Sequence, residues 1–284
     1  METVKRPKRG WLVVKERRER RDRPYTLTDA DVLSLLEKID SSTDYAHLDF
    51  GSSPQAEELK AYYEALMKHR DKALIALAWL FFKRGSEVLG VRLGDVFIDE
   101  EDKKVEVTFT VKKKAKTFKV CPKCGEKNAR KARYCKACGS SIVDVPVRRK
   151  ASKTPTIVVK RKTLENPFAR TFVRWIRVLK RFQLSPEAYV FPPFDVAKKT
   201  FNFERHLTVA RFDQILQRLD YTLTSHMFRY GAAEKYLRLK YTPHEVAQFG
   251  DWASSVMVEK YAKRKGITPE QERFAEELGW YERK

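Results

Sequence analysis

The chain has 284 residues, of which 42% are hydrophobic and 12% aromatic, so it can build a substantial core and is not a disordered protein. Its formal net charge of +21 favours a polyanionic partner. No apolar run approaches the ~18 residues of a spanning helix and no signal-peptide apolar region opens the chain, so we expect a cytoplasmic, nucleoid-associated protein with no membrane partner.

The positive charge is concentrated in two blocks. Residues 1–24 carry a net charge of +6 and residues 103–163 carry +17, whereas residues 25–70 carry −5. A single charge run is usually a solvated face, but two basic blocks beside an acidic segment indicate a directed surface for nucleic acid. We interpret residues 1–24 as a basic N-terminal arm.

The first half of the chain predicts helices. Thr28 to Asp31 resembles a capping box, and apolar residues then recur at helical spacing. Residues 56–82 predict one or two helices whose last turns, ALIALAWLFF, are apolar all round and therefore belong to the core. Ser86 and Glu87 begin another short helix, and Glu87 is expected to brace Arg84 or to cap that helix.

The pattern then changes from helical to extended. VEVTFTV, which begins at Val105, alternates β-branched and polar residues and predicts a strand. Further strands are expected at residues 142–147 (IVDVPV) and 156–159 (TIVV). The cysteine-rich residues 117–142 therefore look like an insertion at the tip of an antiparallel hairpin.

Helices return after Pro167. The apolar spacing predicts helices over the ranges 168–179, 203–219, 222–239, 242–249 and 257–262, and an amphipathic tail helix within residues 265–284. Thr242 to Glu245 forms another capping box. The whole pattern predicts a mainly α protein with a small antiparallel β-sheet, an α+β fold.

The four cysteines form two C-x-x-C pairs, each followed by glycine. They are Cys121, Cys124, Cys135 and Cys138. This spacing is typical of a tetrahedral zinc site, because each pair forms a tight turn whose thiolates point inward. Two disulfides are the alternative, which a cytosolic chain disfavours. Four thiolates leave no position for water, so we expect a structural Zn²⁺ within a zinc ribbon. The Lys and Arg side chains between the pairs either contact phosphates or form a solvated surface.

The residues between Thr224 and Tyr261 carry groups suited to phosphodiester chemistry. His226 and Arg229 form a His-x-x-Arg pair, and Tyr261 follows Trp252 by nine positions. Arginine forks bind phosphate oxygens, whereas a tyrosine hydroxyl with a pKa near ~10 needs positive charge nearby to act as a nucleophile. A lone tyrosine is more often a packing residue; only its spacing from Trp252 distinguishes Tyr261.

Three blocks together resemble the tyrosine recombinase (phage integrase) family. They are FFKRGSEVLGVRLGDV, SHMFRYGAA and FGDWASSVMVEKY. The resemblance covers residues 25–262 and implies the recombinase catalytic fold, carrying the ribbon as an insertion. It also implies catalytic roles for Arg84, His226, Arg229, Trp252 and, as nucleophile, Tyr261.

The resemblance further implies a lysine in the β-hairpin. Lys113 and Lys150 fit that place equally well, on either side of the ribbon. It also implies cleavage and rejoining of double-stranded DNA through a 3′-phosphotyrosine, independent of ATP and metal, by a homo-oligomer assembled on the DNA. No small-molecule substrate is expected.

The expected organisation is an arm (1–24), a catalytic domain (25–264), a ribbon within it (117–142) and a tail (265–284). Family members usually carry a separate DNA-clamping domain before the catalytic one, and here only the arm precedes it. On the family resemblance, a site-specific recombinase or integrase of a mobile element is the first hypothesis. A type IB topoisomerase-like enzyme, a non-catalytic DNA-binding protein on the same scaffold and an RNA-binding zinc-ribbon protein are the alternatives.

Overall fold

The computed structural model describes residues 27–42, 49–111, 117–149, 156–252 and 254–264. The chain divides into two compact units: residues 109–158 form one, and the rest of the chain forms the other. The arm (1–24), the tail (265–284), Lys113 and Lys150 lie outside the described residues.

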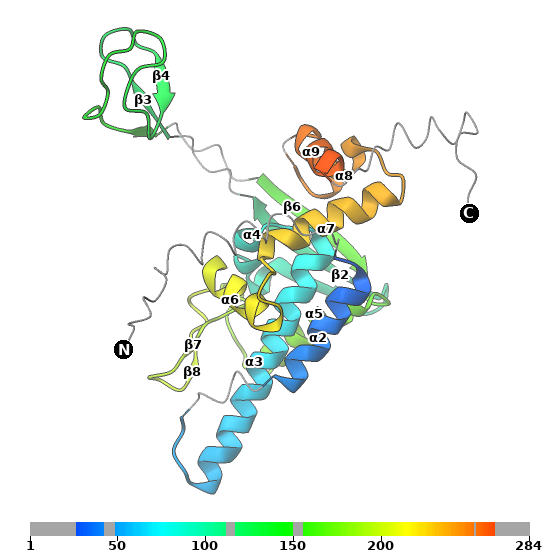
Figure 1. The fold of residues 1–284 in the computed structure, drawn as a ribbon. Coiled ribbons are helices and arrows are strands. Elements are labelled where there is room, and N and C mark those ends of the chain that lie inside the picture. The colour runs from blue at the N-terminus through cyan, green and yellow to red at the C-terminus, as the bar shows by residue number, and fades with distance from the viewer. Residues whose placement is uncertain (1–26, 43–48, 112–116, 150–155, 253, 265–284) are drawn as a thin grey trace, which may run out of the picture. The chain divides into compact units, whose positions relative to one another are not determined.

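Helices dominate the larger unit (Figure 1). The helices are α2 (Asp29–Ser41), α3 (Pro54–Phe81), α4 (Gly85–Leu89), the 3₁₀ turn η1 (Leu93–Asp95), α5 (Pro167–Lys180), α6 (Val209–Leu219), α7 (Ser225–Arg238), α8 (Pro243–Phe249) and α9 (Val256–Arg264). The strands are β1 (Val96–Asp99), β2 (Lys104–Val111), β3 (Thr117–Val120), β4 (Lys127–Ala129), β5 (Arg148–Arg149), β6 (Thr156–Thr163), β7 (Phe194–Asp195) and β8 (Thr200–Phe201). The prediction of a mainly α protein with small antiparallel sheets is confirmed.

Helix α3 forms the centre of the larger unit. Its last turns, from Ala73 to Phe81, are buried on every side, as the apolar sequence predicts. Figure 1 shows α2, α3 and α5 side by side, and α3 also contacts α7. The C-terminal end of α3 is therefore a fixed platform for the residues that follow it.

Short polar signals correctly predict where two helices begin. Thr28 and Asp31 form the capping box of α2, and Thr242 and Glu245 form that of α8. The predicted helix over residues 203–219 is wrong at its start, because Thr208 caps α6 with its side chain and the helix proper begins at Val209.

The sheet of the larger unit has the strand order β1-β2-β6. Strand β1 pairs antiparallel with β2, with Val96 opposite Val107. Val105 and Val107 face the core, which explains the alternating sequence of β2. Because β2 and β6 are neighbours in the sheet, the cysteine-rich segment leaves from one strand and returns to the next.

The smaller unit has its own sheet, in the order β4-β3-β5, and its own apolar cluster. The predicted strand over residues 142–147 is wrong. Ile142 is fully buried in the apolar cluster beside Cys121 and Cys135, and Val143 and Val147 are exposed in irregular chain. The apolar character of that segment serves the cysteine-rich core and not a strand.

Helices α7, α8 and α9 pack around a third apolar cluster. Ala233 and Leu237 of α7 meet Val246 of α8 and both Val258 and Ala262 of α9. Among the described residues, no helix is long and apolar enough to cross a membrane.

Candidate active site and metal centre

Arg84 lies at the junction between α3 and α4. Phe82 adopts the left-handed conformation (φ 55°) and turns the chain away from α3. Arg84 Nη1 then donates to Glu87 Oε1 at 2.8 Å, and its backbone N–H donates to Glu87 Oε2 at 3.0 Å. The Glu87 side chain is 5% exposed and that of Arg84 is 44% exposed. Glu87 therefore braces Arg84, as predicted, and leaves the guanidinium accessible to a ligand.

His226 and Arg229 lie on the first turns of α7. Three residues apart, they share one face of the helix. Arg229 is only 1% exposed, and its Nη1 donates a 2.7 Å hydrogen bond to the carbonyl of Phe82. This bond joins segments 147 residues apart and brings the His-x-x-Arg pair to the Arg84 segment.

Trp252 stacks on Arg229. The guanidinium carbon lies 3.9 Å from the centre of a ring of Trp252, well within cation–π range. The backbone N–H of Trp252 donates to the carbonyl of Ala247 at 2.9 Å, which ties this loop residue to α8. A Cβ atom on Gly250 would lie 1.7 Å from the indole, so this close approach requires glycine.

The His226 side chain lies at the protein surface, beside Tyr230. Partial burial, and then the charges of Arg229 and Arg84, lower the pKa of His226 below its ordinary 6.5, against a smaller opposing effect of Asp213. The lowered pKa favours the neutral imidazole at pH 7. Tyr230 packs edge-to-face on the imidazole, with the ring centroids 4.3 Å apart.

Three charged residues beside this cluster escaped the sequence analysis. Lys83 is fully buried and forms an ion pair with Asp251, and Lys160 of β6 lies 3.3 Å from the same carboxylate. Burial lowers the pKa of Lys83 and Asp251 opposes that shift. Lys83 and Asp251 are the sequence neighbours of Arg84 and Trp252, which was a signal available in the sequence. Nothing in the sequence indicated that the two pair with each other or with Lys160.

Tyr261 belongs to α9, which packs on α7 through Val258 and Ala262. The nucleophile expected from the sequence is thus carried by a helix docked against the helix of His226 and Arg229. The Tyr261 side chain lies outside the described residues, as do Lys113 and Lys150, the two hairpin lysines. Arg84, His226, Arg229 and Trp252 are the expected site residues that the structure brings together.

The four-cysteine cluster is built from two similar turns. In the first, the amide of Gly125 donates to the carbonyl of Cys121 at 2.9 Å; in the second, the amide of Gly139 donates to that of Cys135 at 3.0 Å. Both glycines have positive φ (72° and 70°), which the C-x-x-C-G spacing predicts. Each turn presents its two cysteines to the other turn.

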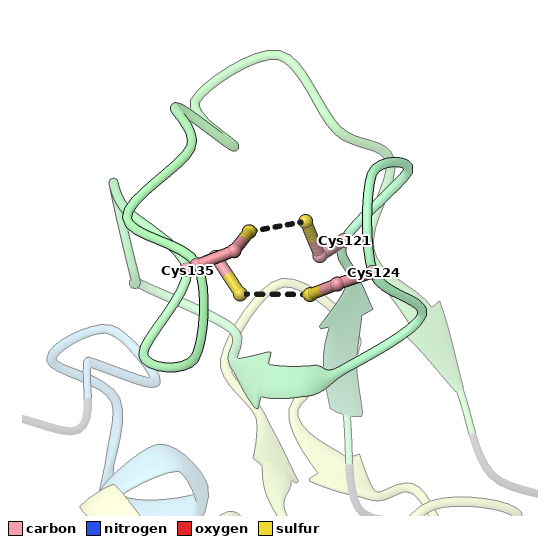
Figure 2. Close-up of side chains that lie close together, drawn as sticks. Cys121, Cys124 and Cys135 are labelled. Carbon is pink, nitrogen blue, oxygen red and sulfur yellow. Dashed lines mark hydrogen bonds between the residues drawn. The ribbon is translucent and has the colours of Figure 1, made fainter.

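The four sulfur atoms lie within 4.8 Å of one another. Cys121 Sγ lies 3.6 Å from Cys138 Sγ, and Cys124 Sγ lies 3.5 Å from Cys135 Sγ. Figure 2 shows the group, with Cys121, Cys124 and Cys135 labelled. Tetrahedral zinc with Zn–S bonds of ~2.3 Å needs sulfur separations of ~3.8 Å, so the donor set fits this ion. Backbone amides, chiefly that of Cys138, lower the pKa of Cys135 to about 6, whereas contacts with the other cysteine sulfurs raise the pKa of Cys124 to about 12.

The ribbon surface is basic. Four side chains between the cysteine pairs are exposed to solvent: Lys127, Arg130, Lys131 and Arg133. Tyr134 beside them is 66% exposed. This arrangement suits contact with a phosphate backbone.

No protein-family model matches the sequence, and no curated protein matches it significantly. The chain is similar to a solved structure of the XerH site-specific recombinase bound to palindromic difH substrate, a post-cleavage complex, with 13% sequence identity and a TM-score of 0.51. That match covers 91% of this chain and 54% of the XerH chain. A pre-cleavage complex of XerH with difH gives 13% identity and a TM-score of 0.48, covering 84% of this chain and 50% of that one.

The chain thus spans about half the length of the recombinase structures that it matches. At this identity the similarity establishes the fold and leaves the activity to be argued from the site. The chain has the α+β fold of the tyrosine recombinase structures.

Proposed function

We propose that this chain cleaves and rejoins double-stranded DNA through a covalent link to Tyr261, as a site-specific recombinase or integrase of a mobile element. One observation carries the proposal. Arg84, His226, Arg229 and Trp252, drawn from three distant segments, gather beside the helix that bears Tyr261. The recombinase fold supports the same activity.

The proposed reaction begins when the Tyr261 oxygen attacks a DNA phosphorus. The bond from phosphorus to the 5′ oxygen breaks, which leaves a 3′-phosphotyrosine and a free 5′ hydroxyl. Arg84 and Arg229 donate hydrogen bonds to the non-bridging oxygens and stabilise the charge of the pentavalent state.

Proton transfer completes the cleavage step. Neutral His226 accepts or relays the proton of the nucleophile, and a hairpin lysine, Lys113 or Lys150, protonates the departing 5′ oxygen. The covalent link retains the energy of the broken bond, so reversal of these steps rejoins the strand without ATP.

We assign the four cysteines to a structural Zn²⁺. Their geometry and donor type fit this ion, and four thiolates would close its coordination shell. The ion holds the ribbon folded, and the exposed basic side chains of the ribbon contact DNA phosphates. Together with the arm, residues 1–24, the ribbon would supply DNA contacts beyond the catalytic unit. We expect the chain to assemble as a homo-oligomer on the DNA.

A covalent-trapping assay tests the activity. A duplex nicked just beyond the scissile phosphate loses a short strand after cleavage and so retains the covalent complex. We expect the full chain to form a complex that resists denaturant, and Tyr261→Phe to bind DNA without forming it. Tyr281→Phe is the matched control and should react normally. A covalent complex formed by Tyr261→Phe would refute the assignment of the nucleophile.

Two alternatives give different results in related assays. A type IB topoisomerase-like enzyme would relax supercoiled plasmid without a specific site or a second DNA. A non-catalytic DNA-binding protein would retain the scaffold, bind DNA and form no covalent complex with any substrate.

A further inference from the structure

Arg229 is held from two sides by Phe82 and Trp252, and the residues next to these two in sequence, Lys83 and Asp251, form an ion pair. We propose that the buried Lys83–Asp251 pair fixes the position of Arg229 and Trp252, so that Lys83 and Asp251 are positioning residues of the site. The inference rests on the proposed function for its catalytic consequence, whereas its structural part can be tested separately.

Arg229 contacts two segments of the chain that are also connected to each other. Phe82, whose carbonyl accepts from Arg229 at 2.7 Å, is followed directly by Lys83. Trp252, whose ring centre lies 3.9 Å from the Arg229 guanidinium carbon, is preceded directly by Asp251. The ion pair between Lys83 and Asp251 therefore links the two segments that contact Arg229.

The pair differs from an ordinary surface ion pair. The Lys83 side chain is 0% exposed, and a buried ammonium without an anionic partner is strongly disfavoured. An apolar residue would fill a buried position at lower desolvation cost, so a charged pair is best explained by the geometry that it specifies.

The backbone of both segments that contact Arg229 has an unusual conformation. Phe82 and Asp251 both adopt left-handed conformations, with φ of 55° and 51°. Glycine would adopt these angles without strain, whereas other residues pay a conformational cost. The contact of the Asp251 carboxylate with Lys83 offsets that cost. It also fixes the backbone of Asp251, so that the following residue, Trp252, packs on Arg229.

A third element is tied to the same carboxylate. Lys160 Nζ on β6 lies 3.3 Å from Asp251 Oδ2 and donates to the carbonyl of Phe249 at 3.0 Å. The loop between α8 and α9 is therefore anchored to the sheet as well as to the end of α3. The Asp251 carboxylate contacts the ammonium groups of Lys83 and Lys160. Removing its charge would therefore weaken the attachment of this loop to α3 and to the sheet.

The test uses the full chain with Asp251→Asn, which keeps the size of the side chain and removes its charge. The first readout is the NMR signal of the Arg229 side chain in arginine-labelled protein, assigned with Arg229→Lys. The Trp252 ring shifts this signal by its ring current, and we expect Asp251→Asn to move it towards the position seen in Trp252→Ala. Asp251→Glu retains the charge and should restore part of the shift.

The second readout is the rate of covalent-complex formation on saturating nicked DNA. We expect Asp251→Asn to lower it by about tenfold to hundredfold while DNA affinity changes little, because a misplaced phosphate ligand slows the chemical step. The matched control is Asp102→Asn, which breaks the exposed Lys104–Asp102 pair, 2.8 Å long, in the same unit. The control should change neither the Arg229 signal nor the rate.

An Arg229 signal that stays at the wild-type position in folded Asp251→Asn would overturn the proposal. If Asp251→Asn does not fold, Lys160→Met and Lys83→Arg provide milder changes of the same contacts, and an unchanged Arg229 signal in both would be equally decisive. Absence of any covalent complex in the wild-type chain would refute the proposed function instead, and the NMR result would still decide the positioning role.

Discussion

The guanidinium carbon of Arg229 lies 3.9 Å from the centre of a ring of Trp252. The family resemblance implies a catalytic role for Trp252, and its ring contacts the arginine that we propose binds the phosphate. An aromatic face over a buried guanidinium restricts its rotation while leaving its edge to donate hydrogen bonds. Residues that shape this contact should therefore affect cleavage without touching DNA.

Gly250 is the first such residue. A Cβ atom there would lie 1.7 Å from the Trp252 ring, so Gly250→Ala must displace the indole from Arg229. We expect a loss of about 1–3 kcal/mol in the free energy of unfolding, as for other overpacked sites, together with slower covalent-complex formation. Chemical denaturation and the trapping assay measure the two effects.

The Trp252→Ala background provides the control for Gly250→Ala. If the clash with the indole is the cause, the alanine should add almost no further loss of stability once the ring is removed. Equal losses in both backgrounds would show that Gly250 acts through the backbone alone.

His226 should titrate below 6.5 in the folded chain. Burial and the charges of Arg229 and Arg84 lower its pKa, so the folded state binds fewer protons than the unfolded state in this window. Between the lowered pKa and about pH 6.5, the contribution of His226 to the free energy of unfolding should therefore rise with pH. Above about pH 6.5 this contribution should no longer change with pH. NMR titration of the imidazole gives the pKa directly.

Removing one of the charges tests the cause of that shift. Arg84→Gln should raise the pKa of His226, because it deletes a nearby positive charge and leaves the burial of the ring in place. Arg92→Gln, which changes the residue just before the 3₁₀ turn η1, is the control and should leave the titration of His226 unchanged. An unaltered pKa in Arg84→Gln would show that the two side chains do not interact.

Local sequence signals predicted much of this structure because they act over a few residues. The all-round apolar turns of α3 from Ala73 to Phe81 admit only a buried helix, and the two C-x-x-C-G turns fix their own geometry. The spacing of His226 and Arg229 likewise placed them on one helical face. Apolar content alone was a poorer guide: Ile142 suggested a strand and is buried among cysteines.

Long-range pairing could not be predicted in the same way. Lys83 and Asp251 are separated by 168 residues, and neither belongs to a periodic pattern. In a chain with 59 basic and 38 acidic residues, nothing local indicates which lysine pairs with which carboxylate. The buried ion pair follows from the packing of α8 and α9 near the end of α3, which only the three-dimensional structure gives.

Removal of zinc should unfold the ribbon and weaken DNA binding without removing a catalytic group. Among the described residues of the ribbon, the apolar cluster has only three buried members, Cys121, Cys135 and Ile142, so we expect the proposed metal to supply most of the ribbon's stability. We expect Cys135→Ser and strong chelators to abolish bound zinc, measured by elemental analysis, and to shift the ribbon signals in NMR spectra to random-coil positions. Ser141→Ala, which changes an exposed residue next to the second cysteine pair, is the control and should retain the metal.

Covalent trapping on the zinc-free chain separates the structural role from a catalytic one. At DNA concentrations high enough to saturate the weakened chain, cleavage should recover. If cleavage stayed absent on fully bound DNA, the assignment of the metal to a structural role would be wrong.

The salt dependence of DNA binding tests the ribbon surface. Each phosphate contact that is lost should lower the slope of log affinity against log salt by ~0.9. Replacing Lys127, Arg130 and Arg133 with Gln should therefore reduce the slope by up to ~3 while leaving the ribbon folded, because these side chains are exposed. Lys180→Gln and Lys198→Gln alter exposed charges of the other unit and serve as controls. A slope that falls equally in the controls would show that net charge, and not the ribbon surface, determines DNA affinity.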